Sequence, residues 1–427
     1  MTDHASAPAG DSTPPKPEYP LLAAPKDGVP EVIESERALV AAAQALAGAD
    51  GPVAVDAERA SGFRYGNRAY LVQLRREGAG SFLIDPIACP DLSPIQDALG
   101  DAEWVLHAAT QDLPCLAEVG LHPTSLFDTE LGSRLAGLPR VGLAAVVEHY
   151  LGVTLAKEHS AVDWSERPFP QSWLTYAALD VEVLIQVREA LAADLQQQGK
   201  GEWAAQEFAA LTHFTAPVRE EPWRRTSGMH RTKNRRAVAR VRELWLTRDA
   251  LAQQRDTAPG RVLPDALLVE LANKDPKNAA ELAQVRAAPP KGRSVGRPHP
   301  GLLRHRDKWL DALRRAGQLP DKQLPAANAR TEGPPPARAW ADRDPVAAAR
   351  LSAAREALAG VSQERQIPVE NLLTPDTLRR VLWSPPEPLD AERIRQQLAD
   401  LGARPWQVEI ATPIIADAVS AHLPTSE

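Results

Sequence analysis

Hydrophobic positions near the start of the chain change repeatedly between helical and strand-like spacing. In IESERALVAAAQALAG, one side of a predicted helix carries Leu39, Ala42, Ala43 and Leu46. Three strand-like runs follow, GPVAVDAE, AYLVQLRR and SFLIDP, which we expect to pair as antiparallel neighbours. After a short helix, SPIQDALG, and a fourth strand, EWVLHA, the chain to residue 210 has mainly helical patterning. The pattern predicts an α/β domain with a mixed sheet flanked by helices.

A helical pattern then occurs twice. RRAVARVRELWLTRDALAQQRD leads through TAPGRVLP to DALLVELANKDP, and DPVAAARLSAAREALAGVSQERQ leads to VENLLTPDTLRRVLW. In both, a long charged helix is followed by a Pro-bearing connection and a short helix that opens at an Asp. We therefore expect Asp265 and Asp376 to N-cap their helices. The similarity predicts a diverged internal repeat of two all-α modules.

These patterns divide the chain into six parts. The Pro-, Ala- and Ser-rich beginning is predicted to be a disordered tail, and two polar or Pro-rich linkers flank the first helical module. In chain order they are the tail (1–25), the α/β domain (26–215), a linker (216–231), the first module (232–316), a second linker (317–343) and the second module (344–427).

The composition is that of a globular protein that folds in water. Hydrophobic residues make up 44% and charged residues 25% of the 427 residues. No apolar run approaches the roughly 18 residues of a membrane helix, and the N-terminus lacks the regions of a secretory signal. The two cysteines, Cys89 and Cys115, argue against a disulfide framework or a Cys-based zinc site, and are expected to be small core residues. We expect a cytoplasmic protein with no membrane partner.

Charge is distributed unevenly along the chain. The net charge of −7 is unfavourable for nucleic-acid binding, but residues 232–316 contain 19 Lys and Arg against 9 Asp and Glu. A basic module beside an acidic domain could attract phosphate while the acidic domain holds metal. A solvated basic surface is the alternative interpretation.

Two carboxylates end the first strand-like run. Asp56 and Glu58 are two residues apart on a strand, so both side chains leave the same face. The apolar Val53, Ala54 and Val55 before them are typical of a central strand. This arrangement favours a bound cation, and a polar strand end is the alternative.

Three more segments carry candidate acidic groups. Asp112, in HAATQDLPCL, and Asp128, in LFDTELG, are placed on predicted helices, where each could be a simple cap. In TYAALDVEVL, Tyr176 and Asp180 lie one helical turn apart beside an apolar stripe. A phenol there could hold a metal-bound water, although such a pair is usually a surface hydrogen bond.

Taken together, the acidic segments predict a metal site, because carboxylates brought together in a fold repel one another unless cations lie between them. On these motifs the chain resembles the DEDD superfamily of 3′→5′ exonucleases, most closely the ribonuclease D family, over about residues 30–215. VDAE resembles the first exonuclease motif, HAATQDL the second and YAALD the third. The third has the tyrosine form, since the histidine form would need His at Thr175. The element order also resembles a ribonuclease-H-like domain, and the two helical modules resemble HRDC domains, the first more than the second.

The resemblance implies a metal-dependent 3′→5′ exoribonuclease with two Mg²⁺ or Mn²⁺ ions and no organic cofactor. Asp56, Glu58, Asp112 and Asp180 would ligate the ions, with Asp56 bridging them, and Tyr176 would orient or help activate the attacking water. The substrate would be the 3′ ends of RNA, tRNA precursors among them, and the products 5′-nucleoside monophosphates.

Two alternatives stay open at this point. One is a DNA-directed exonuclease of the same subclass in repair, because 2′-hydroxyl contacts cannot be identified from a sequence. The other is a catalytically silent nucleic-acid-binding adaptor, against which the intact acidic set argues. Asp128 is expected to support the metal site from outside, and His107 to be structural, because hard cations prefer oxygen.

Substrate contacts are predicted from aromatic and cationic side chains near the motifs. Aromatic groups would stack on the terminal nucleotides and cations would meet phosphate, while core packing is an equal alternative for Tyr70 and Gln73. The candidates are Phe63, Tyr65, Tyr70, Gln73, Lys157 and Arg167. In the first helical module, one predicted helix could contact phosphate backbones through Arg235, Arg236, Arg240, Arg242, Arg248 and Arg255.

Overall fold

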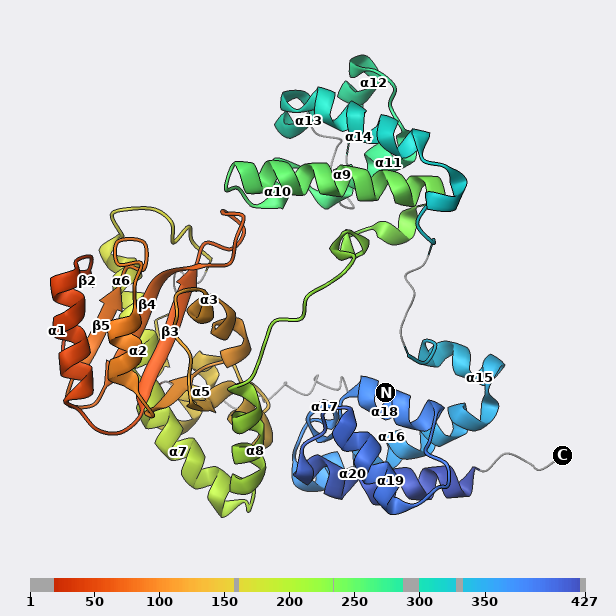
Figure 1. The fold of residues 1–427 in the computed structure, drawn as a ribbon. Coiled ribbons are helices and arrows are strands. Elements are labelled where there is room, and N and C mark those ends of the chain that lie inside the picture. Colours follow the sequence, from red (N-terminus) through yellow and green to blue (C-terminus); the bar gives the residue numbers. More distant parts are fainter. Residues whose placement is uncertain (1–18, 157–160, 233, 287–298, 328–332, 423–427) are drawn as a thin grey trace, which may run out of the picture.

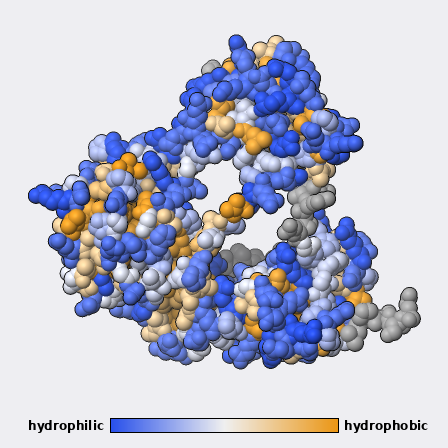
Figure 2. All heavy atoms as spheres, in the orientation of Figure 1, coloured by the Kyte–Doolittle hydropathy of each residue, from blue (hydrophilic) through white to orange (hydrophobic). Residues whose placement is uncertain are grey.

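The computed structural model describes residues 19–156, 161–232, 234–286, 299–327 and 333–422. These form an α/β domain and two helical modules, and the three parts lie around an opening (Figures 1 and 2). No described helix is both long enough and apolar enough to cross a bilayer.

A six-stranded mixed sheet forms the centre of the α/β domain, with strand order β2-β5-β4-β3-β6-β7. As predicted, β3, β4 and β5 are antiparallel neighbours. The structure adds that β6 runs parallel to β3. Each edge strand is parallel to its neighbour. The strands are β2 (Val32–Ile33), β3 (Val53–Arg59), β4 (Ala69–Arg76), β5 (Gly80–Ile84), β6 (Glu103–Leu106) and β7 (Ser125–Asp128). Strand β3, which carries the first acidic motif, is therefore interior.

Helices cover both faces of this sheet (Figure 1). One face packs against α1 (Glu36–Ala47), α2 (Ser93–Leu99) and α3 (Leu113–Glu118), and α1 buries the four residues predicted for its apolar side. The other face packs against α6 (Gln171–Glu182) and α7 (Leu184–Gln197). Because Asp56 and Glu58 leave this second face, α6 covers them.

The rest of the domain completes these layers. It consists of α4 (Thr129–Leu135), α5 (Leu143–Leu151), α8 (Gly201–Leu211), and the parallel pair β1 (Leu21–Leu22) and β8 (Thr154–Leu155). Two predictions are wrong here. The segment around Leu126 and Phe127 forms a strand where a helix was predicted, because four residues are too few for periodicity to distinguish the two. Leu21–Leu22, predicted to lie in a disordered tail, pair with β8 instead.

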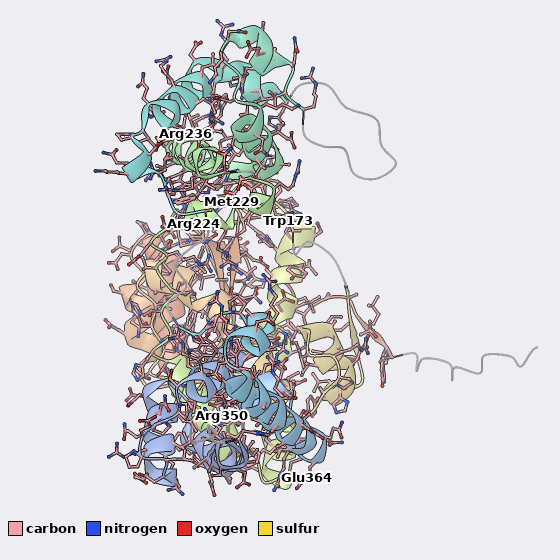
Figure 3. The ribbon with its side chains drawn as sticks, turned by 90° about the vertical axis from the view of Figure 1, so that its right-hand side faces the viewer. Trp173, Arg224, Met229, Arg236, Arg350 and Glu364 are labelled. Carbon is pink, nitrogen blue, oxygen red and sulfur yellow. The ribbon has the colours of Figure 1, made fainter. Side chains whose placement is uncertain are left out.

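The first helical module packs around Leu244 and Trp309, both fully buried. Its helices are α9 (Arg235–Gln254), α10 (Pro259–Val262), α11 (Asp265–Lys274), α12 (Ala279–Ala283), α13 (Pro300–Arg304) and α14 (Arg306–Gln318). Part of the predicted linker belongs to this module, because the 3₁₀ helix Pro222–Arg225 buries Trp223 against α9. Figure 3 shows Arg224 and Met229 on the side of the module that faces the α/β domain.

The second module repeats the order of a long helix, a four-residue helix and a short helix. Its helices are α15 (Trp340–Arg343), α16 (Pro345–Arg365), α17 (Val369–Leu372), α18 (Pro375–Trp383), α19 (Ala391–Asp400) and α20 (Pro405–Ala421). Trp340, at the end of the predicted second linker, is fully buried against Trp383. The buried Arg350 donates to the carbonyl of His422 at 3.0 Å, which ties α16 to the end of α20 (Figure 3).

The predicted N-caps are wrong in both modules. Pro264 is the N-cap of α11, and Asp265 lies in the first turn, where it accepts from Arg248 at 2.6 Å. In α18 the hydroxyl of Thr374 accepts from the backbone of Thr377. The cap lies one residue before Asp265 and two residues before Asp376. In α18, Pro375 takes the first helical position, which its fixed φ favours.

The second module and the α/β domain share one continuous core. Helix α8 packs against α20, where Trp203 stacks on Trp406 with ring centroids 5.0 Å apart. The indole of Trp406 donates to Glu207 at 3.0 Å. This module is therefore part of the same folded body as the six-stranded sheet.

Candidate active site

Three acidic side chains converge between β3 and α6. Asp56 and Glu58 leave the same face of β3, and Asp180 comes from α6 above it. One carboxylate oxygen from each lies within 4.8 Å of the other two. The apolar side of α6, which includes Ala177 and Val181, is buried on the sheet, so the flank with Asp180 is held against the acidic strand.

Asp112 joins the same cavity from the chain that follows β6. It lies between the 3₁₀ helix Ala109–Gln111 and α3, is 5% exposed, and makes no capping hydrogen bond to α3. The simple-cap alternative is therefore wrong for this residue. Its carboxylate is instead turned into a cavity of about 970 Å³ that the other three acids also line.

Asp128 holds the turn that positions Asp112. Its carboxylate accepts from the backbone N–H groups of Ala108 and Ala109, at 3.1 and 2.9 Å. It also caps α4 through Glu130 and Leu131. Ala108 adopts a left-handed conformation with φ 60°, which a non-glycine residue keeps only when its surroundings fix it. Asp128 is therefore a structural support next to the acidic cavity.

The four carboxyl groups are electrostatically strained without a cation. Burial raises the pKa of Asp56 from 3.8 to about 6. Burial, and then the neighbouring carboxylates, also raise the pKa of Glu58 and of Asp112 well above their ordinary values. The pKa of Asp180 is raised for the same reasons, although a hydrogen bond from Tyr176 opposes the shift. A divalent cation would relieve this repulsion.

The phenol of Tyr176 also lines the cavity. Burial and the nearby carboxylates raise its pKa, so it stays protonated and can donate a hydrogen bond at neutral pH. His107 lines the cavity too, but its Nδ1 lies 2.9 Å from the hydroxyl of Thr129, and burial lowers its pKa to about 4. It is a neutral side chain with a structural partner, as expected.

Arg59 is a cavity residue that the sequence analysis did not identify. Arg59 follows Glu58, lines the cavity, and places Nη2 3.3 Å from Oδ1 of Asp112. Its position directly after the acidic pair was the available signal, but nothing local in the sequence shows that it would face Asp112.

Phe63 and Tyr65, predicted to stack on nucleotides, instead contact the first helical module. The guanidinium of Arg261 lies 4.1 Å from the centroid of the Phe63 ring, and the backbone of Phe63 accepts from Ala258 at 2.9 Å. The hydroxyl of Tyr65 donates to Asp249 at 3.0 Å. These aromatic side chains serve a contact within the chain, which local sequence cannot distinguish from stacking on a base.

The remaining predicted substrate contacts fare differently. Tyr70 is 4% and Gln73 0% exposed, so both belong to the core alternative. Gln73 lies opposite Asp56 in the β3–β4 pair, and its amide has no hydrogen-bond partner among the described residues. Arg167 uses its donors within the protein, on Asp85 at 2.6 Å and on three backbone carbonyls, so a phosphate contact is not supported. Lys157 lies outside the described residues.

Most of the arginines predicted to meet phosphate along α9 also have partners inside the protein. Arg235 and Arg236 donate to carbonyls between Ala316 and Pro325, at the end of α14 and after it. Arg240 pairs with Asp275 at 2.6 Å, and the buried Arg248 pairs with Asp265. Figure 3 shows Arg236 within the module. Arg255, at the end of α9, is exposed.

Comparison with known proteins identifies the family. A family model described as 3′-5′ exonuclease matches residues 30–196, one described as HRDC domain matches 237–294, and one described as 3′ to 5′ exonuclease C-terminal domain matches 333–419. Ribonuclease D of Gluconacetobacter diazotrophicus is 32% identical over 67% of this chain and 72% of its own. The chain belongs to the ribonuclease D family. By this relationship it is a 3′→5′ exoribonuclease. The predicted α/β exonuclease domain and the first of the two predicted HRDC modules are confirmed, whereas the second module matches the C-terminal domain model instead.

Another family member and two solved structures are also similar to this chain. Ribonuclease D of Granulibacter bethesdensis is 34% identical over 55% of this chain and 59% of its own. A protein of solved structure from Bifidobacterium adolescentis is 38% identical, with a TM-score of 0.83 over 94% of this chain and all of the other. Escherichia coli RNase D, at 24% identity and a TM-score of 0.67 over 92% of this chain and 99% of its own, shares the fold.

Proposed function

We propose that this exoribonuclease hydrolyses the terminal phosphodiester with two divalent cations held by Asp56, Glu58, Asp112 and Asp180. The observation that carries the proposal is the convergence of these four carboxyl groups, from three separate chain segments, on one cavity. An all-oxygen donor set of this kind suits the hard cations Mg²⁺ and Mn²⁺. Asp56 lies on the interior strand, and its carboxylate raises the pKa of each of the other three acids, so it is the proposed bridging ligand.

The donor set fits such ions on electrostatic grounds. All four carboxyl groups have raised pKa values, first because they are buried. Neighbouring carboxylates raise the pKa of Glu58, Asp112 and Asp180 further, so bound cations would stabilise the charged forms. When bound, the ions would activate the attacking water and neutralise charge on the leaving 3′-oxygen. Tyr176 supplies a protonated hydroxyl beside Asp180, suited to orienting the water.

The proposed substrate is the 3′ end of RNA, tRNA precursors and other structured RNA included, with 5′-nucleoside monophosphates as products. The similarity to proteins named ribonuclease D supports RNA as the substrate. DNA is the alternative substrate, and the test below distinguishes the two. We also propose that the catalytic unit is residues 26–215, that the HRDC-like modules guide RNA, and that the protein acts in the cytoplasm.

The test uses 5′-labelled RNA and DNA strands of one sequence, incubated with Mg²⁺, Mn²⁺ or EDTA. We expect a metal-dependent ladder that shortens from the 3′ end of the RNA. Asp56→Asn and Asp180→Asn should abolish it while retaining the fold, and Asp50→Asn, an exposed residue just before β3, should not. Near-normal turnover by either cavity variant would contradict the metal site, and equal action on DNA would favour the repair alternative.

A further inference from the structure

Arg59 stands where a cation is needed. It lies just past the register shift that separates it from Glu58 at the end of β3. Its Nη1 donates to the carbonyl of Gln111 at 2.7 Å, and its Nη2 lies 3.3 Å from Asp112. The guanidinium thus spans the neighbouring backbone and an acid of the cavity.

Exposure distinguishes the two partners of this ion pair. The Asp112 side chain is 7% exposed, whereas that of Arg59 is 26% exposed and borders the open cavity. The positive charge of Arg59 also lowers the pKa of Asp56, Glu58 and Asp112 against the larger effect of burial. Arg59 therefore neutralises part of the acidic cluster from its rim.

Arg140 is the other arginine that lines the described part of this cavity, and it has a different position. Its side chain is 65% exposed, and its partner is Glu148 on α5, at 3.5 Å, outside the four-acid set. The ion pair with the acidic set is made by Arg59. An ion at Asp112 would have to compete with that guanidinium for the same carboxylate.

We propose that Arg59 stays paired with Asp112 in the absence of RNA. When RNA binds, Nη2 of Arg59 donates to a substrate phosphate instead, which releases Asp112 for the metal. This inference rests on the proposed metal site. The bond to Gln111 would keep the guanidinium at the rim while Nη2 changes partner. A guanidinium presents several donors in one plane, which suits phosphate oxygens better than the point charge of lysine.

The transfer predicts that phosphate and metal bind cooperatively. Phosphate that draws Arg59 away removes a competitor from Asp112, so the metal binds more tightly, and by thermodynamic linkage the metal strengthens phosphate binding equally. An arginine that only supported the fold would give the opposite result on removal, because a disordered cavity would bind metal less well.

The experiment measures Mn²⁺ binding by electron paramagnetic resonance, with and without 5′-AMP as an unreactive phosphate probe. We expect AMP to tighten Mn²⁺ binding in the natural protein. In Arg59→Gln, Mn²⁺ alone should bind as tightly or more tightly, AMP should bind about tenfold more weakly, and the cooperativity should fall by about fivefold or more. Arg59→Lys should retain part of the AMP affinity.

Arg68→Gln is the matched control, since Arg68 is exposed and lies over the Tyr70 ring. Thermal unfolding of each variant verifies the fold. If the natural protein binds Mn²⁺ and Arg59→Gln retains both affinities and their cooperativity, the role of Arg59 is wrong and the metal site stands. If Arg59→Gln is folded but loses Mn²⁺ binding, Arg59 is structural. If the natural protein binds no Mn²⁺, the proposed metal site fails as well.

Discussion

The hydroxyl of Tyr65 donates a hydrogen bond to the carboxylate of Asp249, and so joins the loop after β3 to α9 of the HRDC module. The same loop contributes the ion pair of Arg64 with Asp256, and Arg261 donates to the carbonyl of Gly62 at 2.8 Å. Because this loop begins only a few residues after Glu58, the position of the HRDC module is linked directly to the strand that carries the first acidic motif.

Weakening this contact should loosen the module without altering the acidic cavity. We expect Tyr65→Phe to increase amide hydrogen exchange around residues 256–262, because it removes one hydrogen bond of a small contact. Tyr150→Phe is the control, since Tyr150 makes a comparable bond to Asp194 inside the α/β domain. Equal exchange in natural and Tyr65→Phe protein would show that the hydrogen bond does not hold the module.

Stability should depend on pH and divalent cations together. A carboxyl group whose pKa is raised in the folded state contributes stability below its ordinary pKa, and this contribution is lost as the pH rises through the folded value. For Asp56 the window runs from about pH 4 to about 6, so the Tm of cation-free protein should fall across it. Mg²⁺ should restore more stability at pH 8 than at pH 5, where protons compete for the same oxygens.

Differential scanning fluorimetry at both pH values, with and without Mg²⁺, measures this effect. The Asp56→Asn protein should show a flatter pH dependence and a smaller gain from Mg²⁺. A Mg²⁺ gain that is larger at pH 5 would contradict the sign derived from these pKa shifts.

The second module should contribute stability to the catalytic domain. Trp406 is 2% exposed, stacks on Trp203 and donates to Glu207, so Trp406→Ala should cost about 3–5 kcal/mol. Chemical denaturation measures the loss, and is followed by far-ultraviolet circular dichroism because that signal reports the backbone and not the tryptophan. Trp245→Ala, in the other module and only partly buried, should cost less. A loss below about 1 kcal/mol would indicate that the second module and the catalytic domain fold independently of each other.

Sequence patterns predicted the acidic strand and the helix above it because both are local. The helical spacing of hydrophobic residues in α6 placed Asp180 and Tyr176 on its flank. The alternation of side chains along β3 placed Asp56 and Glu58 on the same face. Partners far apart in the chain were not predictable in this way. Phe63 and Tyr65 bind a module about 190 residues away, and Arg167 binds Asp85, which lies 82 residues earlier. An arginine or tyrosine has the same local signature whether it meets RNA or its own chain.

The same reasoning changes where RNA should meet the HRDC module. Arg236 and Arg240 have partners inside the protein, but Arg255, Arg304 and Lys308 are exposed. Burial lowers the pKa of the nearby His305, and the charges of these three residues lower it further. We expect the triple variant Arg255→Gln, Arg304→Gln, Lys308→Gln to weaken RNA binding. Its plot of log affinity against log salt should be shallower by up to about 2, since each lost phosphate contact on a single strand contributes about 0.7.

Arg236→Gln is the contrasting variant for this measurement. It removes donors to carbonyls at the end of α14 and just after it, so it should lower the midpoint of unfolding and leave the salt dependence of RNA binding unchanged. Fluorescence anisotropy with labelled RNA across a salt series, beside a denaturation curve for each protein, separates the two effects. If the triple variant has the same salt dependence as the natural protein, the exposed cations form a solvated surface. The net positive charge of the module would then serve a purpose other than contact with RNA.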